Sequence, residues 1–231
     1  SLTVLKSISF FFKKIYIKFI NSNKYKWVVQ TELMKRELSK GLNIKVSNIF
    51  SFPIFKDFNF KKTLDKKSNS FLYVCSSSPH KNINRLIQAF NQIKNINSKT
   101  IYLDLTIDDE TFFKENILSK NINKNLVIKN HGNSNESSLK KLYSQSKFLI
   151  YPSVVESFGL PLIESLEFNC KIIASNLPYV NEIVKPSVVF NPFLISSISD
   201  SIDYVIEKNN ITGSEMLIKN KIDKFIELIE S

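Results

Sequence analysis

From Phe71 to Glu207, short apolar segments that fit β-strands alternate with segments that fit α-helices, and the connections between them are brief. The expected strands are Phe71–Cys75, Ile101–Ile107, Leu126–Lys129, Phe148–Tyr151, Lys171–Ala174 and Val188–Phe190, and the expected helices are Asn82–Ile93, Asp109–Leu118, Glu136–Ser146, Gly159–Phe168 and Ile195–Glu207. Such an alternation is typical of a parallel sheet with helices on both faces. The pattern therefore predicts an α/β fold.

Ligands of such sheets bind at the carboxyl ends of the strands. The loops that follow Cys75, Lys129 and Tyr151 are therefore where we expect the chemistry of the protein to lie.

The first part of the chain follows a different pattern. It predicts a helix over Leu2–Ile20, a strand over Tyr25–Gln30, a helix from a Thr31 cap to about Leu38 that Gly41 ends, and a strand over Ile49–Pro53. Residues 56–70 are rich in Lys, Asn and Ser, as linkers are. We therefore expect a first segment over 1–55, a linker over 56–70 and the main domain over 71–231.

The charge of the chain restricts its partners. The formal net charge is +11, from 32 Lys and Arg against 21 Asp and Glu. This excess favours nucleic acid, anionic lipid or phosphorylated substrates. Proteins that read nucleic acid depend on Arg for contacts to base edges, and only Arg36 and Arg85 are arginines here. We therefore expect no nucleic-acid partner.

Cysteine and histidine are too few for a metal site of the usual spacing. Cys75 and Cys170 lie far apart beside apolar segments, which favours buried free thiols and a reducing, cytoplasmic compartment. No apolar run reaches the ~18 residues of a membrane span. Leu2–Ile20 is interrupted by lysines and lacks the small-residue cleavage site of a signal peptide. The initial Ser suggests a fragment or a processed product.

The stretch from Tyr151 to Glu164 carries the strongest chemical signal. Glu156 lies between an expected strand and a helix that begins near Gly159, and seven residues separate Glu156 from Glu164. A helix N-terminus is a ready phosphate site, and carboxylates accept hydrogen bonds from sugar hydroxyls. The arrangement suits a ligand with a diphosphate in its middle and polyols at both ends. The alternative is that Glu156 only stabilises the helix dipole and Glu164 is a surface residue.

This stretch resembles the Glu-x7-Glu motif of the family 4 glycosyltransferases. The resemblance extends to Leu142-Tyr143-Ser144 and Phe148-Leu149-Ile150-Tyr151-Pro152-Ser153 before the motif, and to Asn181-Glu182-Ile183-Val184 and Phe190-Asn191-Pro192 after it. It implies the GT-B fold of two Rossmann-like domains that face each other across a cleft. Residues 71–231 would be the nucleotide-sugar-binding domain, and residues 1–55 a remnant of the incomplete acceptor-binding N-terminal domain.

The resemblance also implies roles for the residues of the motif. Glu164 would hold the nucleotide ribose, and Glu156, the candidate catalytic residue, would contact the donor sugar. The backbone amides of Phe158, Gly159 and Leu160 would meet the sugar and the diphosphate. Ser157 stands where the family usually has Gly, and because Ser is small we expect little effect.

Lys81 is the expected phosphate-binding residue of the loop after Cys75, since a lysine ammonium is a compact point charge. Lys81 and Asn82 match the family, but Ser76 and His80 occupy the two positions where the family has an Arg. One phosphate counter-charge is therefore missing. After the strand that ends at Lys129, the resemblance suggests that Asn130 and His131 line the base pocket, mostly through backbone groups.

Together these features predict transfer of a sugar, with retention, from a nucleotide diphosphate donor to a glycan or lipid-linked acceptor. No cofactor or metal is expected, because the helix N-terminus and basic side chains would stabilise the departing diphosphate. Leu2–Ile20 is either an interfacial helix on an anionic membrane or a packed helix of the acceptor domain. Two rivals remain, an inactive sugar-nucleotide-binding module and a nucleic-acid-binding protein.

Overall fold

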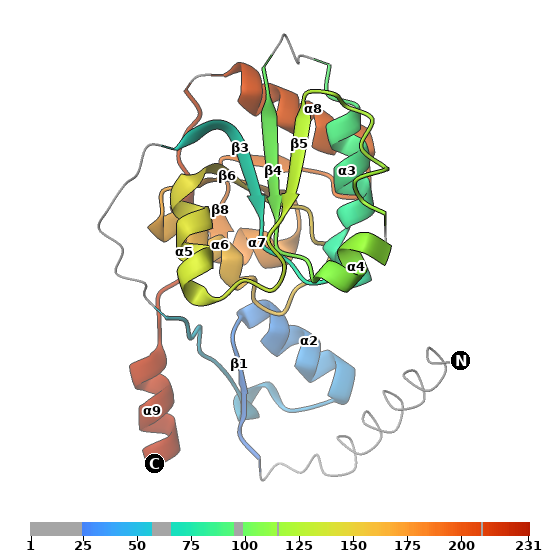
Figure 1. The fold of residues 1–231 in the computed structure, drawn as a ribbon. Helices are drawn as coiled ribbons and strands as arrows, with labels where there is room; N and C mark the ends of the chain where they lie inside the picture. The colour runs from blue at the N-terminus through green and yellow to red at the C-terminus, as the bar shows by residue number, and fades with distance from the viewer. Residues whose placement is uncertain (1–24, 57–65, 95–98, 115, 209) are drawn as a thin grey trace. The chain divides into compact units, whose positions relative to one another are not determined.

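A computed structural model describes residues 25–56, 66–94, 99–114, 116–208 and 210–231. The helix expected over Leu2–Ile20 lies outside these residues. The chain forms two compact units (Figure 1), of which the larger is Lys56–Ile218. The smaller comprises the described residues up to Phe55 together with Lys219–Ser231.

A six-stranded sheet forms the centre of the larger unit. Its strands are β3 (Lys67–Tyr73), β4 (Ile101–Leu105), β5 (Leu126–Asn130), β6 (Ser146–Tyr151), β7 (Lys171–Ser175) and β9 (Val188–Phe190). Their order across the sheet is β5-β4-β3-β6-β7-β9, and every pair is parallel. Numbered along the chain within this sheet, the order is 3-2-1-4-5-6, which is the arrangement of the Rossmann fold. The expected parallel sheet is confirmed.

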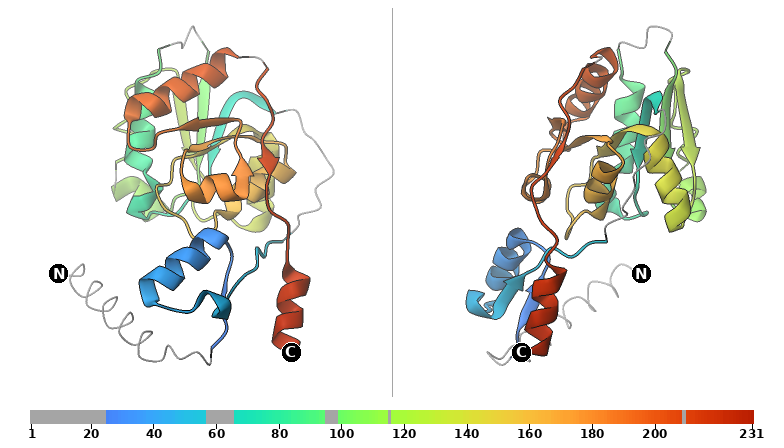
Figure 2. Two further views of the ribbon diagram at one scale, coloured as in Figure 1. Left: turned by 180° about the vertical axis from the view of Figure 1, so that it is seen from behind. Right: turned by 90° about the vertical axis from the view of Figure 1, so that its left-hand side faces the viewer.

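Helices cover both faces of this sheet (Figures 1 and 2). Those of the larger unit are α3 (Ile83–Asn91), α4 (Asp109–Lys114), α5 (Glu136–Gln145), α6 (Leu160–Glu167), α7 (Pro178–Ile183) and α8 (Ile195–Glu207). α3 packs against α8 on one side, and α5 and α6 contact strands on the other. A short antiparallel pair, β8 (Val184–Lys185) with β10 (Glu215–Met216), lies outside the main sheet.

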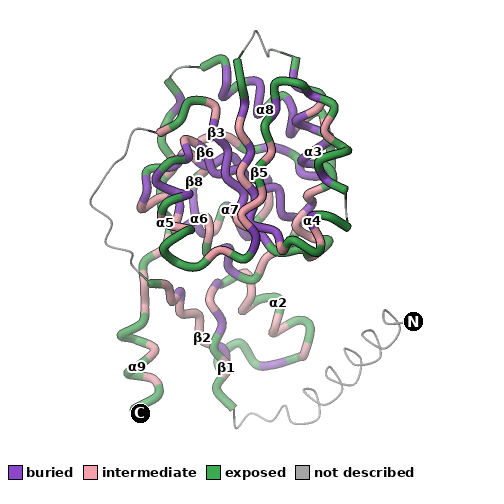
Figure 3. Tube along the Cα trace, in the orientation of Figure 1, coloured by how far each residue is buried: buried purple, intermediate pink, exposed green. Residues whose placement is uncertain are grey.

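Aromatic side chains fill the core beneath the central strands. The ring of Phe71 on β3 stacks on that of Phe148 on β6, with centroids 5.0 Å apart, and meets Phe90 of α3 edge-on at 5.3 Å. All three side chains are buried, and much of β3 and β6 is coloured as buried in Figure 3, whereas β5 is largely exposed or intermediate. This packing fixes the positions of the strand ends that carry the loops.

The linker expected over 56–70 ends earlier than the sequence suggests. β3 begins at Lys67, whose Nζ lies 3.0 Å from the centroid of the Tyr102 ring, and Ser70 is buried within the strand. Polar residues join the sheet here because cross-strand partners satisfy them. Ser70 Oγ accepts a hydrogen bond of 2.9 Å from the Lys147 amide.

The smaller unit contains a parallel pair, β1 (Trp27–Val29) with β2 (Ile49–Ser51), and the helices α2 (Glu32–Leu42) and α9 (Ile222–Glu230). Its core is Val29, Ile44 and Ile49. Thr31 caps α2 as expected, since its hydroxyl accepts a bond of 3.1 Å from the Met34 amide.

The prediction that Gly41 ends α2 is wrong. The helix continues through Gly41 to Leu42, and Asn43 caps it in the left-handed conformation, with φ of 57°. Asn adopts this conformation more readily than most residues. Its backbone N–H bonds the Ser39 carbonyl, so the chain turns two residues later than expected.

The C-terminal end of the predicted main domain also differs. Residues 219–231 group with the smaller unit, so the larger unit does not extend to 231. The Lys221 amide donates to the Pro53 carbonyl at 2.8 Å, and the ring of Phe225 lies 6.3 Å from that of Phe52. The sequence did not predict α9, and these long-range contacts explain its placement.

Candidate functional site

The carboxyl ends of β3 and β6 lie side by side in the middle of the sheet, because these strands pair in parallel. The chain adds β4 and β5 beyond β3, and then β7 and β9 beyond β6. Ligands of doubly wound sheets bind in the crevice at the point where the strand order reverses. The loops after β3 and β6 therefore define the candidate site.

Hydrogen bonds join these two loops. The Tyr73 hydroxyl donates to the Lys81 carbonyl at 2.7 Å, and its oxygen lies 2.9 Å from Ser153 Oγ. The Val154 amide donates to the His80 carbonyl at 2.9 Å. Because Tyr73 is fully buried at the end of β3, the core of the sheet itself fixes the distance between the loops.

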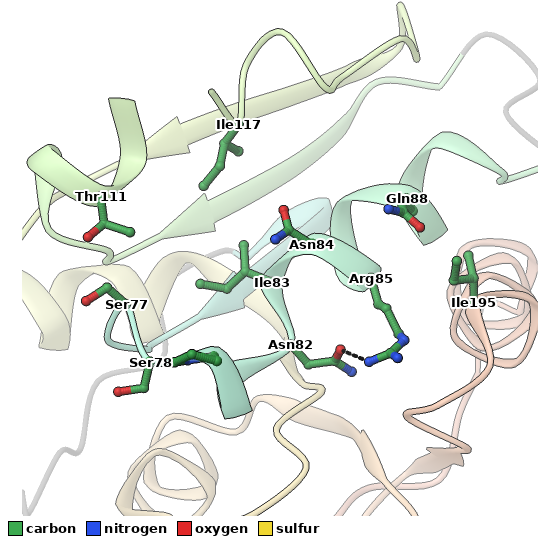
Figure 4. Close-up of a pocket in the computed structure, with 11 residues that line it drawn as sticks. Ser77, Ser78, Asn82, Ile83, Asn84, Arg85, Gln88, Thr111, Ile117 and Ile195 are labelled. Atoms are coloured by element: carbon green, nitrogen blue, oxygen red, sulfur yellow. Dashed lines mark hydrogen bonds between the residues drawn. The ribbon is translucent and has the colours of Figure 1, made fainter. Parts of the chain in front are cut away.

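Asn82 ties a third loop to the other two. Its buried side-chain amide donates to the carbonyls of Pro152, after β6, and of Pro192, after β9, at 3.2 and 2.8 Å. The Arg85 guanidinium donates to the Asn82 side-chain oxygen at 3.0 Å (Figure 4). Asn82 has a φ of 60°, so the chain turns sharply there between the 3-10 turn Pro79–Lys81 and α3.

The structure brings Lys81 and Glu156 together. Lys81 Nζ lies 2.5 Å from Glu156 Oε1, and the two side chains are only 13% and 11% exposed. Because this ion pair is largely shielded from water, removing either side chain would leave the other charge buried without a partner. Burial, followed by the charge of Glu156, raises the pKa of the Tyr151 and Tyr179 phenols, which are therefore protonated at neutral pH.

The start of α6 borders this pair. Gly159 is the N-cap and has a φ of 83°, in the left-handed region, and Leu160 begins the helix with Pro161 next. The N–H groups in the first turn of a helix lack partners within the helix. The Phe158 side chain is buried whereas Leu160 is 43% exposed. Phe158 can therefore offer a ligand only its backbone.

Glu164 lies further along α6 and is half-buried. Its Oε2 accepts a hydrogen bond of 2.7 Å from the hydroxyl of Tyr143 on α5. Burial raises the pKa of this carboxyl, and the hydrogen bond from Tyr143 opposes the rise.

Asn130 is the last residue of β5 and His131 follows it, and both side chains already have protein partners. The Asn130 side-chain amide donates to the Ile107 carbonyl at 2.8 Å and to Asp109 Oδ1 at 2.9 Å. His131 Nε2 lies 2.6 Å from Asp104 Oδ1. A base that enters here would therefore meet backbone groups and the remaining edges of these side chains.

A hollow of about 490 Å³ adjoins the loop after β3 on the α3 side (Figure 4). Its polar lining includes Ser77, Ser78, Asn82, Arg85, Gln88 and Thr111. Lys81, Glu156 and Glu164 do not line it, although Ser77, Ser78 and Asn82 belong to the same loop as Lys81.

Sequence reasoning missed Tyr73, Tyr143, Ser153 and Arg85, which hold the site together. Tyr73 and Tyr143 sit in apolar segments where an aromatic residue reads as core. The signal that could have found them is their polar hydroxyl, since a buried Tyr O–H usually has a hydrogen-bond partner.

Among the described residues, no three His, Cys, Asp or Glu side chains gather closely enough to hold a metal ion. No helix within the same residues has the length and apolar character needed to cross a membrane. Cys75 and Cys170 are free and buried, as expected.

The family model described as glycosyl transferases group 1 matches residues 55–224. This match covers most of the chain, and the protein belongs to that family.

The curated relatives are named for the transfer of mannose to O-antigen chains and for the biosynthesis of capsular polysaccharide. The chain is 28% identical over 190 residues to the O-antigen chain mannosyltransferase RfbU of Salmonella typhimurium, covering 79% of this chain and 52% of that protein. It is 27% identical over 133 residues to the capsular polysaccharide biosynthesis glycosyltransferase CapH of Staphylococcus aureus, covering 56% of this chain and 36% of that protein. The chain thus spans about half the length of RfbU and less of CapH.

Solved structures confirm the fold. A mutant of S. aureus TarM in complex with Fondaparinux, alpha-GlcNAc-glycerol and UDP is similar with a TM-score of 0.68, at 19% identity, over 85% of this chain and 40% of that one. Anabaena HepE in complex with UDP and glucose is similar with a TM-score of 0.64, at 15% identity, over 78% of this chain and 53% of that one. These neighbours are GT-B glycosyltransferases, and the larger unit has the corresponding Rossmann-like fold.

Proposed function

We propose that this chain is part of a metal-independent family 4 glycosyltransferase that moves a sugar from a nucleotide diphosphate donor to a glycan or lipid-linked acceptor, with retention, in the synthesis of a cell-surface polysaccharide. Membership of the group 1 family supports this proposal, as do the names of the relatives. Because the chain spans about half the length of RfbU, we expect it to bind donor and to turn over poorly alone.

The roles proposed for the site residues are those that the family resemblance implies. Lys81 and the amides at 158–160 would meet the diphosphate, and Glu156 the donor sugar. Glu164 would hold the ribose, and the backbone around Asn130 and His131 would line the base pocket. The side-chain pairing of Lys81 with Glu156 carries the proposal, because it joins a phosphate-binding cation to a hydroxyl-binding carboxylate at the switch point of the sheet.

The electrostatic part of the reaction would fall to Lys81 and the start of α6. As the bond to the sugar breaks, negative charge grows on the diphosphate, and fixed donors aimed at that charge stabilise it. Residues 1–55 would be a remnant of the acceptor-binding domain, and 71–218 the donor-binding domain. We place the enzyme in the cytoplasm, and the residues 2–20 segment would either contact an anionic membrane surface or belong to the acceptor-binding domain.

The experiment begins with a panel of nucleotide sugars screened for thermal stabilisation of the chain. Calorimetry with the best ligand then compares Lys81→Ala and Glu156→Ala, using both the nucleotide sugar and the free nucleoside diphosphate. Lys81→Ala should weaken both ligands by about 10-fold, as the loss of one charge-assisted hydrogen bond does.

Glu156→Ala should act differently, because it removes a sugar contact and releases Lys81. It should weaken the nucleotide sugar by about 10-fold relative to the free nucleoside diphosphate. Lys185→Ala, which opens the exposed pair with Glu215, serves as the control and should change neither affinity. Unchanged affinities in both site variants would refute the assignment.

An inactive sugar-nucleotide-binding module is the second candidate, favoured by Ser76 and His80 at the two positions where the family can have an Arg. The full-length protein separates the two readings. Sugar transfer to an acceptor supports the enzyme, and tight donor binding without transfer supports the module.

A further inference from the structure

The contact between Glu164 and Tyr143 joins two helices that cover the same face of the sheet. Tyr143 belongs to α5 and Glu164 to α6, and the phenol hydroxyl donates to Oε2 at 2.7 Å. Within the described part of the chain, Oε1 of Glu164 has no protein partner. One oxygen of the carboxylate is thus fixed by the protein and the other is left for a ligand.

Tyr143 cannot easily move away from this bond. Its side chain is 1% exposed, and its ring stacks on that of Phe168 with centroids 5.5 Å apart. Its carbonyl accepts from Lys66 Nζ and from Cys170 Sγ, each at 3.3 Å. The phenol is therefore held by its ring, its backbone and its hydroxyl, and the direction of its O–H is set before any ligand arrives.

A fixed phenol donor affects both the geometry and the charge of Glu164. Hydrogen bonds to the ionised form of a carboxyl favour that form. The other influences oppose ionisation: burial and the nearby carboxylates of Glu167 on α6 and Glu136 on α5 all raise the pKa of Glu164. Tyr143 is the group that acts in the opposite direction.

An ionised carboxylate oxygen can accept hydrogen bonds from both hydroxyls of a vicinal diol, whereas protonation of that oxygen turns one of its acceptor positions into a donor. We propose that Tyr143 is a positioning residue that keeps Glu164 ionised and turns Oε1 toward the cis-diol of the ligand's ribose. This inference rests on the proposed function, because it assigns the diol to a nucleotide.

The test replaces Tyr143 with Phe and measures ligand affinity against pH. UDP-glucose and GDP-mannose serve as probes, because both phosphates of each are esterified and lack the ionisation near pH 6 of a phosphate monoester. The affinity should fall on the acid side as Glu164 becomes protonated. In Tyr143→Phe this fall should begin about one pH unit higher, with binding about 10-fold weaker near pH 5 and less affected near pH 8.

The controls separate positioning from folding. Tyr204→Phe, which alters an exposed tyrosine of α8, should not change the pH at which the affinity falls on the acid side. Glu164→Gln should abolish the fall in affinity at low pH, and adding Tyr143→Phe to that variant should not restore the fall. A uniform loss of affinity at every pH in Tyr143→Phe would overturn the inference. So would an affinity that falls at the same pH in Tyr143→Phe as in the wild type, or a wild-type fall at low pH that persists in Glu164→Gln.

A second measurement distinguishes failure of the positioning role of Tyr143 from failure of the proposed function. If the wild-type chain binds none of the probes, the proposed function fails. The effect of Tyr143 on Glu164 is then read without a ligand, by carbon NMR titration of ¹³C-labelled glutamate carboxyls, with Glu164→Gln assigning the signal. A Glu164 pKa that stays unchanged in Tyr143→Phe would overturn the positioning role itself.

Discussion

Gly159 is the residue of the site whose backbone conformation most narrowly limits its identity. Its φ of 83° lies in a region that side chains disfavour, and an added Cβ would come within 3.1 Å of Leu162 Cδ1. The sequence suggested a glycine for close approach to a ligand. The structure adds a second reason, since the turn from β6 into α6 requires the left-handed conformation.

Gly159→Ala should therefore destabilise the larger unit by about 1–2 kcal/mol, the cost of a left-handed residue that carries a Cβ. Urea unfolding followed by circular dichroism measures this change. Gly41→Ala is the matched control, since a Cβ added at Gly41 inside α2 would meet no atom within 4 Å apart from the neighbouring backbone of its own helix. That substitution should stabilise the chain by roughly 0.5–1 kcal/mol. Equal effects of the two substitutions would contradict the argument.

At the residue scale, the sequence singled out candidate site residues but did not show which of them contact one another. Lys81 and Glu156 were each expected to bind the ligand, and the structure brings them into direct contact. Their pairing could not be predicted, because it depends on β3 and β6 lying side by side. The hydrogen bond from Tyr143 to Glu164 likewise depends on how α5 and α6 pack.

At the scale of elements, the cross-link made by Asn82 determines how the loops of the site are arranged. One buried amide bonds the carbonyls after β6 and β9 while its own backbone lies in the loop after β3. The three loops can therefore not shift independently without breaking a buried hydrogen bond.

Asn82→Asp tests this cross-link, because Asp keeps the shape and tolerates the left-handed conformation but has no N–H to donate. The carbonyls of Pro152 and Pro192 would lose their donor and face a carboxylate, which should destabilise the chain by about 2 kcal/mol or more. Asn169→Asp is the control, since Asn169 is also left-handed, with φ of 54°, but is exposed. Thermal unfolding should show a large drop for Asn82→Asp and almost none for Asn169→Asp. Comparable drops would disprove the cross-link.

Elements with strong periodicity were predicted well, and elements that depend on remote partners were not. The strands of the sheet were found because they are short, apolar and regularly spaced. Lys67–Ser70 was expected to be linker because its residues are polar, yet pairing with β4 and β6 draws it into β3. The end of α2 was misplaced because Asn43, rather than glycine, supplies the left-handed cap.

At the scale of the whole molecule, the two ends of the described chain meet in the smaller unit. The side-chain amide of Asn220 donates to the Phe55 carbonyl at 2.5 Å, and Phe225 of α9 packs near Phe52. A pattern read along the sequence placed residues 219–231 in the main domain, because nothing local indicates a partner so distant along the chain.

Phe225→Ala should lower the stability of the smaller unit by about 1–3 kcal/mol, since it removes a half-buried aromatic contact. Trp27 on β1 is the single tryptophan of the chain, so its fluorescence reports on this unit. The Trp27 transition in urea should move to a lower concentration. Ile229→Ala, at a position 66% exposed on the same helix, should leave it in place. An unmoved transition in Phe225→Ala would show that the contact contributes little.

The closed pair between Lys81 and Glu156 has one more consequence, which concerns the many phosphorylated metabolites of a cell. A ligand that offers only negative charge can bind Lys81, but it leaves the carboxylate of Glu156 without a partner. A ligand that also brings hydroxyl donors satisfies both groups at once. If Lys81 and Glu156 hold the donor as proposed, inorganic phosphate and simple nucleotides would have to break an ion pair whose two interactions the complete donor would replace.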